Sequence, residues 1–274
     1  MLDEYKVLDH GYVKKITVWG SDQEIVEAAR MSTDKGFLGW GPHIKAFDAA
    51  DQEVALTPWQ EEQIRGGDAA AMVMAARKIV RWEPSGPPGD EKLLRYLYEK
   101  KHSTPFEMAG MTIEVQAPIF VFREWHRHRT QSYSEMSARY TPLPDLNYIP
   151  SVERLLVNSK TNKQAGTIKG AEELDEAGAE EFRLELANEY ARQESFYQRS
   201  LRRGVPKELA RIDLPVGRYS KMRASTDLRN WLAFLTLRMA PDAQYEIRVY
   251  ANAVGQLIAE LFPRTWELFV EGRS

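Results

Sequence analysis

A run of fourteen residues, from Arg127 to Tyr140, is too polar to be buried in a protein core. It contains three arginines, a histidine, several hydroxyl groups and one carboxylate, while Met136 and Ala138 are almost its only apolar members. Because burying unpaired charge is costly, this run must lie at the surface or line a ligand site. Arginine binds phosphate and carboxylate through paired hydrogen bonds, and the run contains no lysine. The run therefore predicts an anion site for a phosphorylated ligand, with hydroxyl groups that contact a sugar or a base.

Other interpretations of this run remain open. Mixtures of arginine, glutamate and serine also occur on exposed helices, where each ion pair contributes about 0–1 kcal/mol. The run could be an electrostatic footprint for RNA, with Trp125 and Tyr133 as stacking groups. The formal net charge of −3 and the lack of a wider basic stripe argue against RNA binding. The arginines could also form salt bridges between the subunits of a structural oligomer.

The chain of 274 residues contains no cysteine. Thiolate nucleophiles, thiolate metal sites and disulfides are therefore excluded. The five histidines are scattered, and His126 and His128 would point to opposite sides of a helix, so we predict no metal site. No stretch is apolar enough to span a membrane, and the polar start resembles no signal peptide. We therefore expect a cytoplasmic protein.

Periodicity and turn residues predict an α+β fold, in which a central, mainly antiparallel sheet is flanked by long helices. The expected strands are 11–19, 108–117 and 218–226. The expected helices are 22–33, 90–101, 118–127, 171–203, 228–237 and one that begins near 239. In the helix over 171–203, we expect four side chains to be buried: Leu184, Leu186, Tyr190 and Phe196.

The segment 34–90 is interpreted as a helical insertion within a single domain that spans 1–274. Thr57 and Pro58 form a strong helix start, and 69–80 is expected to continue as helix. Glycine and proline at both ends of the insertion, up to 42 and again over 84–89, indicate loops. The insertion could form a lid or an oligomer contact. Further along the chain, 141–150 and 158–170 are expected to be irregular.

The order of residues from Arg127 onward resembles the signature of the flavin-dependent thymidylate synthases: Arg-His-Arg, then seven residues, then Ser-Ala-Arg-Tyr. Three other stretches are similar to elements of that family. They are Ala29-Arg30-Met31-Ser32, His102-Ser103-Thr104-Pro105-Phe106-Glu107 and Ala243-Gln244-Tyr245-Glu246-Ile247. The resemblance extends from about Ser32 to Ile247, interrupted by the insertion. It implies reductive methylation of dUMP to dTMP without a cysteine nucleophile.

The same resemblance implies the cofactors and the assembly. Reduced FAD would deliver the hydride, NADPH or NADH would be the reductant, and 5,10-methylenetetrahydrofolate would be the one-carbon donor. No Gly-x-Gly-x-x-Gly follows the first expected strand, so a Rossmann-type flavin site is not indicated. The family builds its flavin sites from several subunits of a homotetramer. We expect the same assembly here, with dUMP as ligand and no nucleic-acid or membrane partner.

The resemblance also assigns residues to each ligand. The dUMP-binding residues would be Glu124, Arg127, Glu135, Met136, Ser137, Ala138, Arg139, Arg211 and Arg238. The FAD-binding residues would be Ser32, His102, Thr104, Arg127, His128, Arg129, Glu135, Asp227 and Arg229.

Two of these residues are expected to be catalytic. Arg238 would stabilise negative charge that develops on the uracil ring, although by itself an arginine there could be an ordinary helix-end charge. Ser137 would orient the substrate. No base lies near Ser137 in the sequence, so we do not expect it to act as a nucleophile.

Three positions depart from the family pattern. Glu124 stands where some members have a glutamine that contacts the nucleotide. Asp227 and Ala233 stand where others place asparagine or histidine near the flavin. Asp227 would bring negative charge near a cofactor that already carries phosphates, and the Ala233 side chain has no hydrogen-bond donor. Both positions could alter the affinity for flavin.

Overall fold

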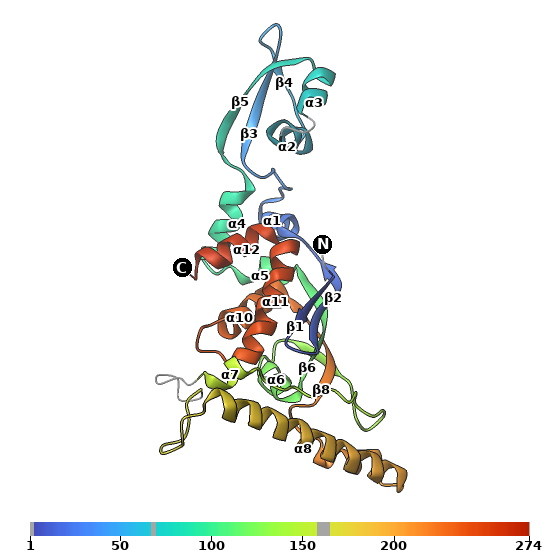
Figure 1. The fold of residues 1–274 in the computed structure, drawn as a ribbon. Helices are drawn as coiled ribbons and strands as arrows, with labels where there is room; N and C mark the ends of the chain where they lie inside the picture. Colours follow the sequence, from blue (N-terminus) through green and yellow to red (C-terminus); the bar gives the residue numbers. More distant parts are fainter. Residues whose placement is uncertain (1–2, 67–69, 158–164, 274) are drawn as a thin grey trace. The chain divides into compact units, whose positions relative to one another are not determined.

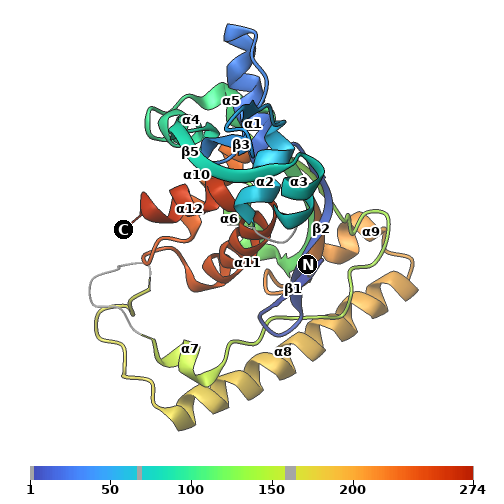
Figure 2. The same cartoon turned by 90° about the horizontal axis from the view of Figure 1, so that it is seen from above.

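The computed structural model describes residues 3–66, 70–157 and 165–273, and it divides into two compact units (Figures 1 and 2). The first unit comprises residues 1–18, 111–226 and 230–257. The second unit comprises residues 19–110, 227–229 and 258–274. Both units are assembled from stretches that are far apart in the sequence. That residues 1–274 form a single domain stays a prediction.

The first unit is built on a five-stranded sheet with the strand order β1-β2-β6-β8-β7. β1 pairs with β2, and β7 with β8, in antiparallel fashion. Met111, Ile113 and Val115 alternate along the central strand β6 and are fully buried, as the sequence pattern predicts. The strands are β1 (Glu4–Val7), β2 (Gly11–Trp19), β6 (Gly110–Pro118), β7 (Ser132–Glu135) and β8 (Tyr219–Asp227). The predicted α+β class and the three predicted strands are confirmed, while β1 and β7 were not predicted.

The helices of the first unit pack around Trp125, Trp231 and Phe234, which are fully buried. Pro118 begins the helix that leads to the Arg127 run, because its fixed φ suits the first turn and it needs no amide partner. The helices are α6 (Ile119–Trp125), α7 (Val152–Leu156), α8 (Glu176–Arg202), α9 (Lys207–Ala210), α10 (Leu228–Arg238) and α11 (Tyr245–Leu261).

The long helix α8, drawn in gold in Figure 1, is confirmed from Glu176 onward. The prediction of its buried face is wrong for two of the four side chains, since Leu184 is 66% exposed and Phe196 is 46% exposed. Apolar residues occur on more than one side of α8, and only one stripe, which includes Tyr197, packs inward. Most of the predicted irregular segment 158–170 lies outside the described residues.

The second unit contains α1 (Asp22–Arg30), α4 (Asp90–Glu99), α5 (Ser103–Glu107) and α12 (Pro263–Glu271). Ser21 caps α1, because its hydroxyl oxygen accepts a hydrogen bond from the Glu24 amide at 3.3 Å. Asp22 is buried and accepts hydrogen bonds from the Thr265 hydroxyl at 2.6 Å and from the Arg264 amide at 2.9 Å. This carboxylate therefore joins the start of α1 to the start of α12, which was not predicted.

The insertion is not purely helical, and this part of the prediction is wrong. The expected helices are present as α2 (Pro58–Gly66) and α3 (Ala70–Ala76), but a three-stranded sheet accompanies them. Its order is β4-β3-β5, with β3 (Pro42–Asp48), β4 (Glu53–Val54) and β5 (Ile79–Pro88). The prolines that suggested a loop lie in β5, where an edge strand tolerates them because one side of its backbone needs no partner.

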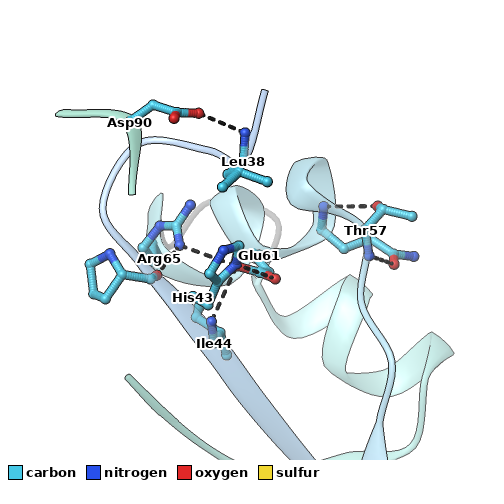
Figure 3. A network of polar contacts seen from close by, with 9 residues as sticks. Leu38, His43, Ile44, Thr57, Glu61, Arg65 and Asp90 are labelled. Atoms are coloured by element: carbon cyan, nitrogen blue, oxygen red, sulfur yellow. Dashed lines mark hydrogen bonds and ion pairs between the residues drawn. The ribbon is translucent and has the colours of Figure 1, made fainter. Parts of the chain in front are cut away.

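A buried carboxylate connects the helices of the insertion to its sheet (Figure 3). Glu61 of α2 accepts a hydrogen bond from the Ile44 amide at 3.1 Å and lies 3.2 Å from Nδ1 of His43. Arg65, one helical turn later, donates to the Pro42 carbonyl oxygen at 2.6 Å. These contacts bind α2 to the start of β3.

None of the helices in the described residues is both long enough and apolar enough to cross a membrane.

Candidate functional site

A cavity of about 470 Å³ lies in the first unit beside α6. Four of the residues predicted to bind dUMP line it: Glu135, Met136, Ala138 and Arg211. The structure thus brings together residues that are up to 76 positions apart in the sequence. The other lining residues are Ile119, Phe122, Arg123, His126, Leu143, Glu208, Ile212, Leu214 and Val216.

The Arg127 run reaches this cavity through β7 and the turn that follows it. Glu135 is opposite Met222 of β8, and the Met136 amide donates to the Lys221 carbonyl oxygen at 2.8 Å. The chain then turns at Ser137, whose carbonyl oxygen accepts from the amides of Tyr140 at 3.0 Å and Thr141 at 3.2 Å. This backbone bonding fixes the turn independently of any ligand.

Ser137 has the local contacts of an orienting hydroxyl. Its Oγ accepts a hydrogen bond from the Arg139 amide at 3.3 Å. Among the described residues, no histidine or carboxylate lies within hydrogen-bond distance of this hydroxyl. That Ser137 orients the substrate and is not a nucleophile stays a prediction.

The walls of the cavity carry both signs of charge. Arg123 of α6 and Arg211, which follows α9, supply guanidinium groups, while Glu135 and Glu208 supply carboxylates. Nε2 of His126 is 4.0 Å from Glu135. Arg139 makes an ion pair with Glu208 at 3.6 Å, and both side chains are more than half exposed. Such an exposed pair is weak, so an anionic ligand could recruit Arg139 at little cost.

A second cluster surrounds Arg238 at the end of α10. Its Nη1 donates to Oε2 of Glu124 at 2.8 Å, and its Nη2 donates to the Glu124 carbonyl oxygen at 3.0 Å. Its Nε donates to Nε2 of His128 at 2.9 Å. The Arg238 side chain is 20% exposed, so this guanidinium is held in place while part of it still reaches the surface.

Burial and charge shift the pKa values of both partners of Arg238. Burial and, to a smaller extent, the neighbouring Arg238 charge together lower the pKa of His128 to about 4. Burial raises the pKa of Glu124, the Arg238 charge opposes that rise, and Glu246 adds to it. His128 is therefore neutral at pH 7, which lets its Nε2 accept the hydrogen bond from Arg238.

The two clusters use opposite faces of α6. Ile119, Phe122, Arg123 and His126 face the cavity. At about 100° per residue, Glu124 lies roughly 150° from the centre of that face. The predicted dUMP residues of one chain are thus divided between two groups, with Glu124 and Arg238 in one and Glu135 to Arg139 and Arg211 in the other. In the part of the chain that the structure describes, neither Arg127 nor Arg129 has a side-chain hydrogen bond or ion pair, and both are exposed.

The predicted flavin residues are also divided. Arg127, His128, Arg129 and Glu135 belong to the first unit, and the remaining five belong to the second. In the second unit, the hydroxyl of Ser32 donates to the Ala29 carbonyl oxygen at 2.9 Å, and Nη1 of Arg229 lies 3.1 Å from Oε1 of Glu107. Asp227 ends β8, His102 precedes α5, and Thr104 is exposed within α5. Ala233 is exposed on α10.

Arg123, His126 and Glu208 line the cavity but were not predicted as site residues. The first two carry a signal that sequence reasoning could have used, because the spacing 119, 122, 123, 126 places one face of the expected helix beside the Arg127 run. Glu208 carries no such signal. It lies 69 residues beyond Arg139 in the sequence, and only the fold brings the two together.

Of the two stacking groups of the RNA alternative, Trp125 is not available for bases and Tyr133 is partly buried. Trp125 is fully buried, and its indole N–H donates to Oε1 of Gln131 at 3.0 Å. The Tyr133 hydroxyl donates to the backbone oxygens of His128 at 2.7 Å and Trp125 at 3.0 Å. The residues that suggested RNA stacking therefore support the fold instead.

Comparison with known proteins gives consistent results. The sequence profile of the family described as "Thymidylate synthase complementing protein" matches residues 15–264. The "Flavin-dependent thymidylate synthase" of Wolbachia pipientis is 33% identical over 271 residues, which cover 99% of this chain and 78% of that protein. The protein of the same name from Thermus thermophilus is 34% identical over 265 residues, covering 97% and 77%. A crystal structure of a UMP/dUMP methylase from Streptomyces cacaoi bound with 5-Br dUMP is similar with a TM-score of 0.69 and 28% identity, covering 97% of both chains.

Proposed function

Since this chain belongs to the flavin-dependent thymidylate synthase family, an enzyme family of methyltransferases, we propose that it converts dUMP to dTMP by reductive methylation. 5,10-methylenetetrahydrofolate supplies the one-carbon unit, and NADPH or NADH supplies the electrons through FAD. The observation that carries this proposal is the restrained guanidinium of Arg238 in a chain without cysteine. Without a thiolate to attack the ring, activation of uracil depends on polarisation by groups such as this one.

The cavity beside α6 supports binding of the dUMP phosphate. Arg211 lines it, and Arg139 at its edge is committed only to an exposed pair with Glu208. Arginine bonds to phosphate are charge-assisted and therefore stronger than neutral hydrogen bonds. Ser137 lies between Met136 and Ala138, which both line the cavity, although Ser137 itself is not one of the lining residues. We propose that its hydroxyl orients the nucleotide.

Arg238 acts on the uracil ring. Three of its five N–H groups are engaged by Glu124 and His128, which leaves two for a ligand. A donor that is already fixed before the substrate binds needs no reorganisation when negative charge develops on the ring oxygens. The guanidinium thereby stabilises the electron-rich form of the uracil ring that attacks the one-carbon donor.

The residues present fit a flavin. Arg127 and Arg129 are exposed guanidinium groups without a partner among the described side chains, and their donor geometry suits the pyrophosphate of FAD. The other flavin-binding candidates that the family resemblance names are Ser32, His102, Thr104, Asp227 and Arg229. When bound, FAD supplies the hydride that finishes the methyl group. The protein groups hold it and exclude water.

We propose that each dUMP site is completed by a second copy of the chain within a homotetramer. Glu124 and Arg238 lie on the face of α6 opposite the cavity that contains Glu135, Ala138 and Arg211. A single nucleotide could contact both groups of residues if one subunit supplied Glu124 and Arg238 and a second subunit supplied the cavity. The exposed apolar side chains of α8, including Leu184, support contacts between subunits.

The absorbance spectrum of the purified protein tests this function. We expect a flavin band, either as purified or after addition of FAD, and we expect titrated dUMP to perturb it. Arg211→Ala should weaken dUMP binding roughly 10- to 100-fold, because it removes a charge-assisted hydrogen bond. Arg202→Ala, at the exposed end of α8, is the matched control and should leave the titration unchanged.

A colourless protein that also fails to bind added FAD would contradict the proposed function. A flavin band that dUMP does not perturb would contradict a shared site for the two ligands. If the protein is colourless and binds no FAD, a structural oligomer held together by its arginines would be the alternative to test.

A further inference from the structure

We propose that His128 is a positioning residue that, together with Glu124, holds the Arg238 guanidinium in one orientation for the uracil ring. The part that concerns uracil rests on the proposed function, whereas the hydrogen-bonded cluster itself does not. This role differs from the direct contact with FAD that the sequence resemblance implies for His128.

The cluster constrains every rotation of the guanidinium. Glu124 accepts from both Nη atoms, with its carboxylate at 2.8 Å and its backbone carbonyl at 3.0 Å, while His128 accepts from Nε at 2.9 Å. Because the guanidinium is planar, three bonds to acceptors on one helix and the loop that follows it fix both its position and its plane. The last two N–H groups, one on each Nη, are then fixed in direction.

His128 is itself held through its ring and through its backbone. Its ring contacts Phe234 edge to face, with the centroids 4.9 Å apart, and Phe234 stacks on the buried Trp125. The backbone carbonyl of His128 accepts from the Tyr133 hydroxyl at 2.7 Å, and its amide donates to the Trp125 carbonyl oxygen at 3.0 Å. The fixed backbone and the contact with Phe234 restrict the ring, so its Nε2 offers Arg238 an acceptor at a defined place.

Only one form of the ring can make this contact. The Nε of Arg238 is a donor that cannot accept, so Nε2 of His128 must be unprotonated and the neutral ring carries its proton on Nδ1. The low pKa of His128, about 4, agrees with this assignment. The charged groups around the cluster are Arg238 itself, Glu124, and Glu246 from α11, which acts on Glu124. With Nε2 occupied, only the Nδ1 proton remains for any other ligand.

Two substitutions of His128 separate positioning from packing. In His128→Gln, the amide oxygen can occupy the place of Nε2 and still accept from Arg238. His128→Leu introduces an apolar side chain of similar size that has no hydrogen-bond acceptor for Arg238. We expect His128→Leu to lower kcat for dUMP roughly 10- to 100-fold with little change in KM, because a misplaced donor weakens the transition state more than the ground state. His128→Gln should retain most of the activity.

A thermal double-mutant cycle tests the cluster without any assay of activity. The melting temperature is measured for the full-length chain as wild type, His128→Leu, Arg238→Met and the double variant. If the two residues interact as proposed, the double variant should lose clearly less than the sum of the two single losses. His128→Gln combined with Arg238→Met should show the same coupling, since the amide also depends on Arg238.

Additive losses in the cycle would overturn the positioning role, as would equal activity of the Leu and Gln variants. If the melting temperatures show coupling between His128 and Arg238 but the wild-type protein forms no dTMP, the cluster is supported and the proposed function is rejected. The two failures are thus distinguishable.

Discussion

Replacing Arg238 by alanine is expected to reduce the turnover of dUMP by about 10²- to 10³-fold, the usual loss when one fixed donor to a developing negative charge is removed. The expectation follows from its geometry. Three hydrogen bonds to Glu124 and His128 fix the guanidinium before substrate arrives, and its side chain is still 20% exposed. The measurement is steady-state dTMP formation under saturating flavin and folate.

The substitution has a second consequence that must be controlled. Without the Arg238 charge, which opposes the rise in the pKa of Glu124, the half-buried carboxylate becomes harder to ionise. The double variant Arg238→Ala, Glu124→Gln removes that carboxylate and should recover stability but not turnover. Arg95→Ala, which breaks an exposed ion pair with Glu271, should leave turnover unchanged. Turnover of Arg238→Ala within about tenfold of wild type would contradict the polarising role.

The largest effect on stability is expected for Asp90→Ala in the second unit. Asp90 is fully buried at the first residue of α4. Its Oδ1 pairs with Arg30, whose Nε is 2.7 Å away, and its Oδ2 accepts from the Leu38 amide at 2.6 Å (Figure 3 shows the latter). The carboxylate therefore joins the end of α1, the chain entering the insertion and the chain leaving it.

Removing this carboxylate leaves Arg30 largely buried and without its partner, at a cost of about 3–5 kcal/mol. At ~2–4 °C per kcal/mol for a protein of this size, the melting temperature should fall by roughly 6–20 °C. Glu271→Ala, which removes an exposed partner of Arg95, is the control and should barely change the melting temperature. A comparably small change for Asp90→Ala would show that the buried pair does not hold the base of the insertion in place.

Local sequence signals predicted most of the elements of the fold. Ser21 before a helix, Pro118 at a helix start and alternation over Met111 to Val115 are each decided by a few neighbouring residues. The insertion was predicted less well, because its prolines are compatible with an edge strand once β3 is present to pair with β5. No local sequence pattern indicated that β3 would pair with β5. The same limit applies to α8, where apolar composition alone did not reveal that Leu184 and Phe196 would be exposed.

The sequence could name candidate site residues, but it could not show how they are arranged in space. The Arg127 run could be identified from residue types and their order, whereas Arg211 was named only by the family resemblance. The structure places Arg211 and part of the run at one cavity. The bond between His128 and Arg238 spans 110 positions and could not be read from spacing. The division of the predicted dUMP residues between two faces of α6 likewise depends on where α10 and β7 pack.

The most direct test of the central claim is the formation of dTMP from dUMP by the purified chain with FAD, NADPH and 5,10-methylenetetrahydrofolate. We expect dTMP to form, to require FAD, and to be lost in Arg238→Ala while Arg95→Ala remains active. Formation of no dTMP by a flavin-loaded, folded protein, or equal formation by protein from which bound flavin has been removed, would contradict a flavin-dependent methylation of dUMP by this chain.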